Sequence, residues 1–470
     1  MERRHFLMSS AAALSAAQSV FGGSPSDTVR IAVIGVGGRG THLGGRGKSH
    51  LDGFGRLDNV QIAAVSDPDQ THLDFGLTTV EQNPKQGKRP AGYIDFRKIL
   101  DDKSIDAITI ATPNHWHALM SIWGCQAGKD AYVEKPCSFN VFESKQIVAA
   151  ARKYNRIVQQ GCQIRSSVAV REGIQKMRDG LIGDVYLSRG LCFKWRDTIG
   201  RTPVSAVPPG VDYNLWTGPA PLGGFTMNRF HYNWHWFWDY GNGDLGNQGI
   251  HEVDVARWGL GVRYPVKVSA IGGHFMFDDD QETPNTLNCA FEFDENGKRS
   301  MMEFEVRHWM TNAEASIGAA RSAPPAPEGE PGAARPPRPE GAGRGAGRPI
   351  ESDRIGNLFY GSKGYLAVDS YQSYKSWLGR SGEPGPAGNQ GGDHMLNFIE
   401  AVRSRKRESL NADIEEGAIS AVLVHLANVS YRVGRTLHFD AATQTCKGDS
   451  EANALLTRKC RAPFVVPENV

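Results

Sequence analysis

A short apolar run that opens into a glycine-rich turn constrains the fold of this 470-residue chain more than any other feature. Residues 30–40 read Arg-Ile-Ala-Val-Ile-Gly-Val-Gly-Gly-Arg-Gly, a buried-type strand followed by a G-x-G-x-x-G turn. Such glycines allow a tight turn and let backbone N–H groups approach a pyrophosphate at the start of the next helix. Glycine-rich turns also occur without a ligand, so whether this one binds a dinucleotide depends on the motifs that follow it. The residues expected to bind a dinucleotide here are Gly35, Gly37, Gly38, Arg39 and Gly40.

The next two apolar segments carry polar residues at their carboxyl ends. The segment 60–65 leads to Asp67, where an acid would accept a hydrogen bond from the adenosine ribose 2′-OH and repel a 2′-phosphate. This predicts NAD rather than NADP, the alternative being a simple turn aspartate. The segment 105–111 leads to a loop and a helix that ends near Gln126. From this loop Thr112, Pro113, Asn114 and His117 are expected to line the cofactor. We predict no metal site here, because His115 and His117 do not share a helical face.

A fourth strand, 131–133, delivers Glu134, Lys135 and Pro136 at its carboxyl end, where ligands of open α/β sheets bind. Glu134 and Lys135 are therefore expected near the cofactor, and Lys135 is a candidate for chemistry, the alternative being a surface lysine. A helix over 141–154 and a strand over 156–160 complete the unit, followed by Gln163 and Arg165.

Composition changes after this point. We predict an NAD-binding Rossmann domain over 28–155 and a second α/β domain over 156–440, in which long β-branched or aromatic segments form an open, mostly antiparallel sheet. Residues 317–349 are crowded with Pro, Gly, Ala and Arg, which predicts a disordered insert. Residues 441–470 are predicted only as a tail.

Residues 229–240 interleave seven aromatic side chains with two histidines. Indole rings beside hydrogen-bonding groups suit a sugar, so at least one of Trp234, Trp236 and Trp238 is expected to face carbohydrate; the alternative is packing. Helical spacing places Asn247, His251 and Asp254 on one face, which makes His251 a candidate general base or acid, or else a packing histidine. The residues expected to contact substrate are Arg165, Trp195, Arg196, Trp234, His235, Asn247 and His251.

The charge balance excludes partners that need a strong field. With 53 basic and 51 acidic residues, nothing favours nucleic acid. The 7 cysteines are scattered and predict buried thiols rather than disulfides or zinc.

Residues 1–27 begin with Arg3-Arg4 before a weakly apolar segment, the layout of a twin-arginine export signal, and that segment is too short for a stable membrane anchor. We therefore expect export to the periplasm, where a dinucleotide enzyme must hold its NAD tightly and regenerate it in each cycle; the alternative is a frayed start.

The motifs Gly35-x-Gly37-x-x-Gly40, Glu134-Lys135-Pro136, Gln163 with Arg165, and the segment 241–254 occur in the order found in the glucose–fructose oxidoreductase, inositol dehydrogenase and MocA (Gfo/Idh/MocA) family, which the chain resembles from about 28 to 440. The resemblance implies that Lys135 lies against the nicotinamide ribose and substrate and that His251 transfers a proton. It also implies a homo-oligomer through the open sheet. One departure is Asn247, because many members carry Asp there.

The resemblance implies an oxidoreductase that passes hydride from a sugar or polyol to NAD, with Lys135, His251 and Asn247 in the catalytic roles. An alternative is a redox-neutral, NAD-dependent glycoside hydrolase, since such enzymes resemble this family and also carry twin-arginine signals. A non-catalytic carbohydrate-binding protein is a third, lesser alternative.

Overall fold

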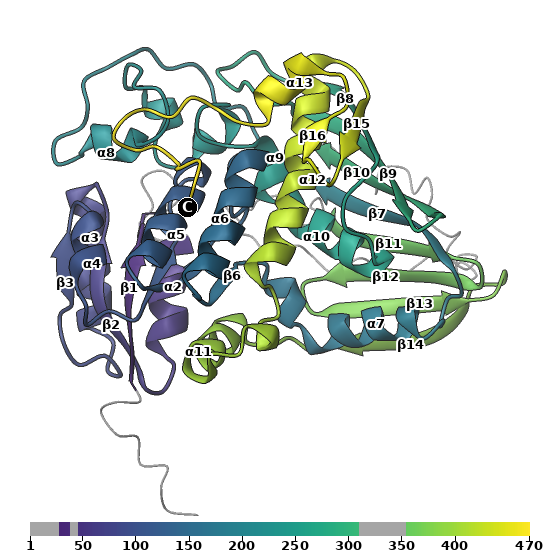
Figure 1. Ribbon diagram of the computed structural model, residues 1–470, viewed down its shortest axis with the longest axis horizontal. Coiled ribbons are helices and arrows are strands. Elements are labelled where there is room, and N and C mark those ends of the chain that lie inside the picture. Colours follow the sequence, from purple (N-terminus) through teal and green to yellow (C-terminus); the bar gives the residue numbers. More distant parts are fainter. Residues whose placement is uncertain (1–27, 38–45, 310–353) are drawn as a thin grey trace, which may run out of the picture.

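The computed structural model describes residues 28–37, 46–309 and 354–470, and they form two sheets that lie side by side under a shared set of helices (Figure 1). This confirms the predicted α/β class. The predicted signal segment 1–27, the loop residues Gly38, Arg39 and Gly40, and the predicted insert 317–349 lie outside the described residues.

The first sheet has six parallel strands in the order β3-β2-β1-β4-β5-β6. Its strands are β1 (Val29–Ile34), β2 (Val60–Ser66), β3 (Ala91–Tyr93), β4 (Ala107–Ile110), β5 (Asp130–Val133) and β6 (Val158–Gln160). The chain order reverses between β1 and β4, so a crevice opens at the carboxyl ends of these strands.

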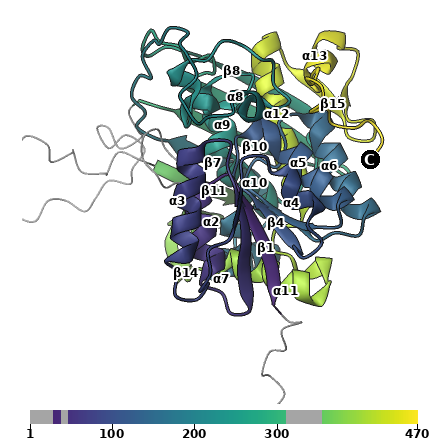
Figure 2. The same cartoon turned by 90° about the vertical axis from the view of Figure 1, so that its left-hand side faces the viewer.

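Helices cover both faces of this sheet (Figure 2). One face packs against α2 (Arg46–Gly55), α3 (Gln70–Glu81) and α11 (His394–Ser404), and the other against α4 (Arg97–Asp101), α5 (Asn114–Gln126) and α6 (Val141–Lys153). In β1, Ile31 and Val33 belong to the first core, whereas Ala32 and Ile34 belong to the second. Burial on both faces explains why this strand is apolar at successive positions.

The second sheet has ten strands in the order β14-β13-β12-β11-β7-β10-β9-β8-β15-β16. Its strands are β7 (Val185–Phe193), β8 (Lys267–Gly273), β9 (Thr286–Glu295), β10 (Lys298–Arg307), β11 (Arg354–Gly361), β12 (Gly364–Ser370), β13 (Ser373–Leu378), β14 (Glu383–Asn389), β15 (Leu437–Asp440) and β16 (Thr445–Cys446). Strands β7 and β10 run parallel and the other described pairs antiparallel, which confirms the predicted mostly antiparallel sheet.

Helices α7 (Val168–Arg178), α10 (Gly249–Leu260) and α12 (Ile414–Val433) cover one face of the second sheet. Tyr186, Ile271 and Met301 are exposed on this sheet, and the predicted homo-oligomer through it stays a prediction. The tail is more ordered than expected: α13 (Ser450–Leu455) packs on α12, and Phe464 joins the core of the first domain beside Trp116.

A long excursion, residues 194–242, leaves the second sheet after β7 and crosses onto the first domain before α9 (Gly243–Asn247). It contains α8 (Tyr213–Thr217) and the short 3₁₀ turns η3 (Met227–Arg229) and η4 (Asn233–Trp236), packed around an aromatic cluster. The backbone N–H of Gln70 donates to Gly210 (3.0 Å) and that of Asp212 to Pro68 (2.8 Å). These bonds fix the excursion above the carboxyl ends of the parallel strands, where α8 stands over α3 (Figure 1).

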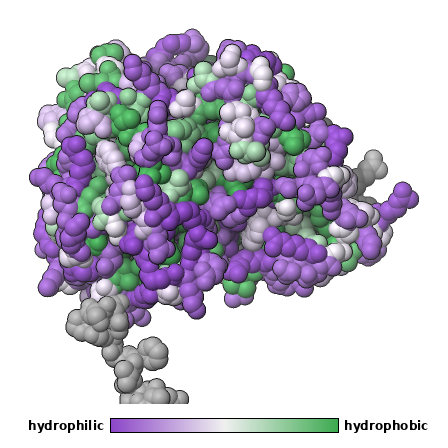
Figure 3. Space-filling view, in the orientation of Figure 1, coloured by the Kyte–Doolittle hydropathy of each residue, from purple (hydrophilic) through white to green (hydrophobic). Residues whose placement is uncertain are grey.

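Hydrophobic residues are scattered among hydrophilic ones on the face seen in Figure 3. Within the described ranges, none of the helices combines the length and apolar character that a membrane crossing needs.

Candidate functional site

A cavity of about 760 Å³ lies between the carboxyl ends of the parallel strands and the excursion. Its size is within the usual range for small-molecule sites. It is lined by Ile34, Gly35, Gly37, Arg46, Lys48, Ser49, Asp52, Ser66, Asp67, Pro68, His72, Ile94, Phe96, Ala111, Thr112, Pro113, Asn114, Trp116, His117, Met120, Glu134, Lys135, Lys194, Arg196, Leu215, Trp216, His231, Tyr232, Trp234, His235, Asn247 and Gln248. Both domains therefore contribute to one site.

The end of the cavity at β1 and β2 has the features of a dinucleotide site. Gly35 has φ +82°, and a Cβ there would lie 2.9 Å from the backbone oxygen of Ala111, so only glycine fits. Asp67 follows β2, and its Oδ2 accepts from the N–H groups of Val36 (2.8 Å) and Gly37 (3.2 Å). The predicted acid thus stands directly beside the described start of the glycine turn.

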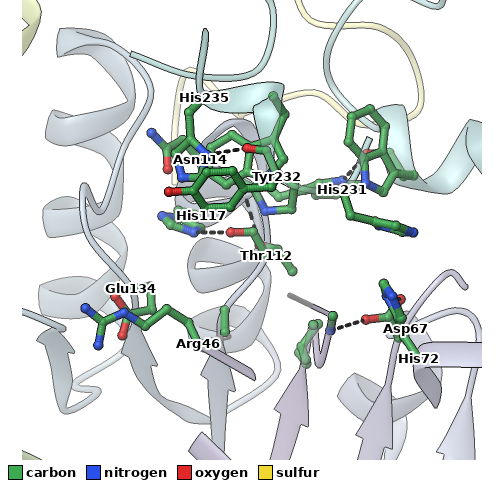
Figure 4. Close-up of a pocket in the computed structure, with 18 of the residues that line it drawn as sticks. Arg46, Asp67, His72, Thr112, Asn114, His117, Glu134, His231, Tyr232 and His235 are labelled. Carbon is green, nitrogen blue, oxygen red and sulfur yellow. Dashed lines mark hydrogen bonds and ion pairs between the residues drawn. The ribbon is translucent and has the colours of Figure 1, made fainter. Parts of the chain in front are cut away.

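Glu134 is held as a buried anion at the carboxyl end of β5. Its Oε1 lies 3.2 Å from Nε2 of His50, and Figure 4 shows Arg46 beside it. Burial opposes ionisation, but Arg46 and His50 outweigh it and hold the pKa of Glu134 well below its usual range. This charge in turn raises the pKa of Arg46. Glu134 therefore keeps Arg46, which lines the cavity, in its positively charged form.

Lys135 extends from the same strand end toward α9. Its Nζ donates to the backbone oxygen of Asn247, and the side-chain Oδ1 of Asn247 lies 3.5 Å away. Burial and the positive charge of Arg46 lower the pKa of Lys135 to about 8. Its neutral form is therefore accessible near neutral pH, as a proton acceptor requires.

A buried carboxylate that sequence reasoning missed stands next to this pair. Asp244 receives two hydrogen bonds from Arg196, both 3.0 Å, and one from Asn247 Nδ2 at 3.0 Å. His308 Nε2 lies 3.1 Å from its Oδ2. Burial opposes ionisation, but Arg196 and His308 hold the pKa of Asp244 far below its usual range. The departure from Asp at position 247 has a physical reason here, because a donor at 247 satisfies Asp244 whereas an acid would repel it.

The roof of the cavity is aromatic. Trp234 and His235 of the predicted aromatic stretch line it, joined by Tyr232 and by Trp216 of α8, which sequence reasoning did not select. Trp236 lies instead under the guanidinium of Arg196, 5.3 Å from ring centroid to Cζ. The sequence alone does not show which of these aromatic residues line the cavity and which pack inside the protein; the fold decides this.

Other predicted residues also line the cavity. Thr112, Pro113, Asn114 and His117 line it, and their expected contact with the cofactor stays a prediction. Figure 4 shows His117 and Thr112 below Tyr232, and Asn114 between Tyr232 and His235. The ring nitrogens of His117 face the carbonyl oxygens of Pro136 (2.7 Å) and Thr112 (2.8 Å), which locks this loop.

Of the predicted site residues that the structure describes, four are not among the cavity-lining residues. Trp195 packs against Trp309 with the two rings tilted (4.0 Å between ring centroids), and Gln163 lies 3.5 Å from both Glu134 and the hydroxyl of Tyr132. Arg165 binds Asp254 through two hydrogen bonds of 2.7 and 2.9 Å. Because these bonds use its guanidinium, Arg165 has few donors left for a substrate. The pair also leaves neither charge alone in the interior of the second domain.

His251 is the fourth, and the single helix predicted for Asn247, His251 and Asp254 is interrupted at one residue. The helix breaks at Gln248, between α9 and α10, so Asn247 turns to Lys135 and Asp254 to Arg165. His251 is buried beside Tyr371, and neither ring nitrogen has a hydrogen-bond partner in the part of the chain that the structure describes. Burial, then Lys135 and Arg46, lower its pKa far below the usual range, so the ring is neutral.

The fold and the cavity define a two-domain protein of the dinucleotide-binding class, with the second domain closing over the cofactor crevice. The chain belongs to the Gfo/Idh/MocA oxidoreductase family: residues 29–162 match the family's NAD-binding Rossmann fold, and residues 167–279 with 384–466 match its C-terminal alpha/beta domain. The cofactor is accordingly NAD, and the tight turn at Gly35 and the acid at Asp67 fit it.

Among curated proteins, a glycosyl hydrolase family 109 protein of Shewanella pealeana is 33% identical over 165 residues, 34% of each chain. An alpha-N-acetylgalactosaminidase of Shewanella oneidensis is 31% identical over 165 residues, again 34% of each. The match thus spans about a third of the length of these relatives.

Solved structures agree over nearly the whole fold. The WlbA dehydrogenase from Bordetella pertussis, in complex with NADH and UDP-GlcNAcA, has a TM-score of 0.60 at 16% identity and covers 88% of this chain and 98% of its own. Levoglucosan dehydrogenase, in complex with NADH and levoglucosan, has a TM-score of 0.58 at 16% identity, covering 89% and 98%. At such identities the likeness concerns the fold.

Proposed function

We propose that this chain is an exported enzyme that oxidises a hydroxyl group of a sugar or polyol, using an NAD that it holds tightly. The observation that carries the proposal is the continuity of one cavity, which joins the dinucleotide end at Asp67 to a lysine of lowered pKa beneath an aromatic roof. The sugar-derived ligands named for the solved neighbours support the substrate class.

The chain's own residues divide the work between positioning and proton transfer. NAD, when bound, supplies the hydride acceptor. Neutral Lys135 accepts the proton of the substrate hydroxyl, since its Nζ reaches the cavity and its pKa of about 8 is close to working pH. Asn247 orients Lys135, and Trp216 with Trp234 offers apolar faces to the sugar ring. His251, neutral and with open ring nitrogens, is the second candidate for proton transfer.

Export and cofactor retention form one part of the proposal. An enzyme outside the cytoplasm has no free pool of NAD to draw on, so its cofactor has to stay bound through the cycle. The excursion supports tight retention of the cofactor, because its backbone hydrogen bonds to residues 68 and 70 close the cavity at the Asp67 end.

The first experiment is to purify the protein without added nucleotide, denature it, and measure the NAD(H) released per chain. We expect close to one equivalent that survives dialysis of the native protein. Release of none, with NAD binding only weakly on addition, would exclude the resident cofactor and favour the carbohydrate-binding alternative. Fusion of residues 1–27 to a reporter tests export separately: secretion that is lost on changing Arg3 and Arg4 to Lys is expected.

A second experiment tests Lys135. Lys135→Met keeps the aliphatic stem but removes the amine, so turnover should fall by about 10²–10⁴. Lys375→Met, at an exposed ion pair with Asp369, is the matched control and should keep full activity. The proposal fails if the two variants turn over sugars or polyols equally.

The curated relatives favour one alternative, a redox-neutral glycoside hydrolase. There, oxidation of the sugar acidifies a neighbouring C–H, the glycosidic group is eliminated, water adds, and the hydride returns to the sugar. Aryl glycosides separate the two functions. Release of the aryl group without net NADH supports the hydrolase, whereas sugar-dependent NADH formation without aryl release supports the oxidoreductase.

A further inference from the structure

Three side chains of metal-ligand type meet at the Asp67 end of the cavity. Asp69, His72 and His231 each place one ligand atom so that all three atoms lie within 4.8 Å of one another. Asp69 and His72 are buried, and the two imidazole rings are 4.1 Å apart between centroids. The ligands come from two domains: Asp69 and His72 begin α3, and His231 extends from the excursion toward His72 and Asp67 (Figure 4).

The cluster is held in place from both sides. Asp69 caps α3, with Oδ1 accepting from Thr71 N at 2.8 Å, and this leaves Oδ2 facing Nε2 of His231 at 2.9 Å. The backbone bonds of Gln70 to Gly210 and of Asp212 to Pro68 tie the two segments together around the cluster. Binding an ion here requires side-chain rotation rather than refolding.

The cluster is also left without a full set of hydrogen bonds. Nδ1 of His72 is buried and has no hydrogen-bond partner within the described ranges. Oδ1 of Asp67 lies 3.6 Å from it, too far for a hydrogen bond. A buried ring nitrogen left open beside two carboxylates is costly unless something fills the gap, and a cation is attracted by both kinds of group.

We propose that Asp69, His72 and His231 bind one divalent transition-metal ion, of which Zn²⁺ fits the donors best. Imidazole nitrogens and a carboxylate oxygen are common zinc ligands, and three of them leave a fourth position for water. The ion replaces the proton that His231 shares with Asp69. Zinc–nitrogen bonds of about 2.0–2.1 Å put ligand atoms about 3.3 Å apart, so shifts of about 1 Å complete the site.

The metal would join the two domains at the cofactor's adenosine end, where the backbone bonds already tie them together. The inference does not depend on the proposed oxidoreductase activity. Sequence reasoning could not reach it, since His231 is 162 residues from Asp69.

The test uses the full-length protein after treatment with a chelator and dialysis. Titration with Zn²⁺ by calorimetry should show one site per chain, and Co²⁺ in its place should give the intense visible absorption of a four-coordinate ion. His72→Gln and His231→Gln should each lose this site. His438→Gln, at an exposed position of β15, is the control and should bind as the wild type does.

A second measurement covers the case in which a variant folds poorly. Hydrogen–deuterium exchange of the wild type, with and without Zn²⁺, should slow in both segments 68–73 and 229–233. Equal zinc stoichiometry in the wild type and His231→Gln would overturn the proposal. So would unchanged exchange at both segments, or zinc uptake that His438→Gln abolishes.

Discussion

Asn247→Asp tests the arrangement beside Lys135 most directly. In the wild type, Nδ2 of Asn247 donates to Asp244 Oδ1 at 3.0 Å, and Arg196 and His308 occupy the remaining space around that buried carboxylate. An aspartate at 247 replaces the donor by a second carboxylate at hydrogen-bond distance. Two carboxylates in one site repel each other and raise the pKa of one of them.

The magnitude follows from two contributions. Losing a hydrogen bond to a charged group costs about 1.5–3 kcal/mol. If repulsion raises the pKa of the new carboxyl by about 2, keeping it ionised at pH 7 costs about 2.7 kcal/mol more. Attraction by Lys135, 3.5 Å from the Asn247 oxygen, offsets part of this. We expect the free energy of unfolding to fall by about 3–5 kcal/mol in Asn247→Asp and by about 1.5–3 kcal/mol in Asn247→Ala.

The difference between the two variants should depend on pH with a defined sign. A carboxyl whose pKa is raised on folding is destabilising only where the unfolded chain is ionised, so the penalty is full above about pH 6 and gone below about pH 4. Urea denaturation followed by tryptophan fluorescence at pH 7 and at pH 4.5 measures it. Equal unfolding midpoints for Asn247→Asp and the wild type at pH 7 would refute the reasoning, as would a gap from Asn247→Ala that does not shrink in acid.

Three further predictions concern residues of the first domain. Gly35→Ala combines a positive φ with a Cβ 2.9 Å from the Ala111 oxygen, so it should lower the thermal midpoint more than Gly128→Ala, which has φ +81° but open space; equal midpoints would contradict the role of the contact. Burial, with help from a nearby arginine, lowers the pKa of His115 to about 3, so the stability it contributes is full above pH 6.5 and is lost as pH falls toward 3, about 2 kcal/mol by pH 5. His115→Gln should flatten that part of the urea-derived stability profile, and an unchanged slope would argue against it. Asp67→Ser should reduce the NAD(H) that copurifies with the chain, measured after denaturation, and a full equivalent would contradict its assignment.

Local patterns in the sequence predicted the parallel sheet and its cofactor end well. Successive apolar positions in Ile31–Ile34 indicate burial on both faces, and the glycines that follow allow a tight turn. Because the carboxyl ends of neighbouring parallel strands share one edge, the sequence alone predicts that Asp67, Thr112 and Lys135 lie close together.

Strands with little intrinsic preference were harder to predict. β14 carries two prolines and two glycines, and it forms because β13 and α7 offer it a surface at the sheet edge. The one-residue break at Gln248 could not be predicted either, because the helical spacing of the sequence continues through it. Because of that break, Asn247 ends α9, whereas His251 lies in the first turn of α10.

The sequence by itself determined the dinucleotide fold, the two-domain plan and the strand ends that supply Asp67 and Lys135, because each depends on short-range periodicity and on the fixed geometry of parallel strands. Only the tertiary structure decided what surrounds those residues. Arg196 reaches Asp244 across 48 residues and His231 reaches Asp69 across 162, both through an excursion without a regular period. Contacts made by such a segment depend on how it packs over the finished sheet, and no local pattern encodes that.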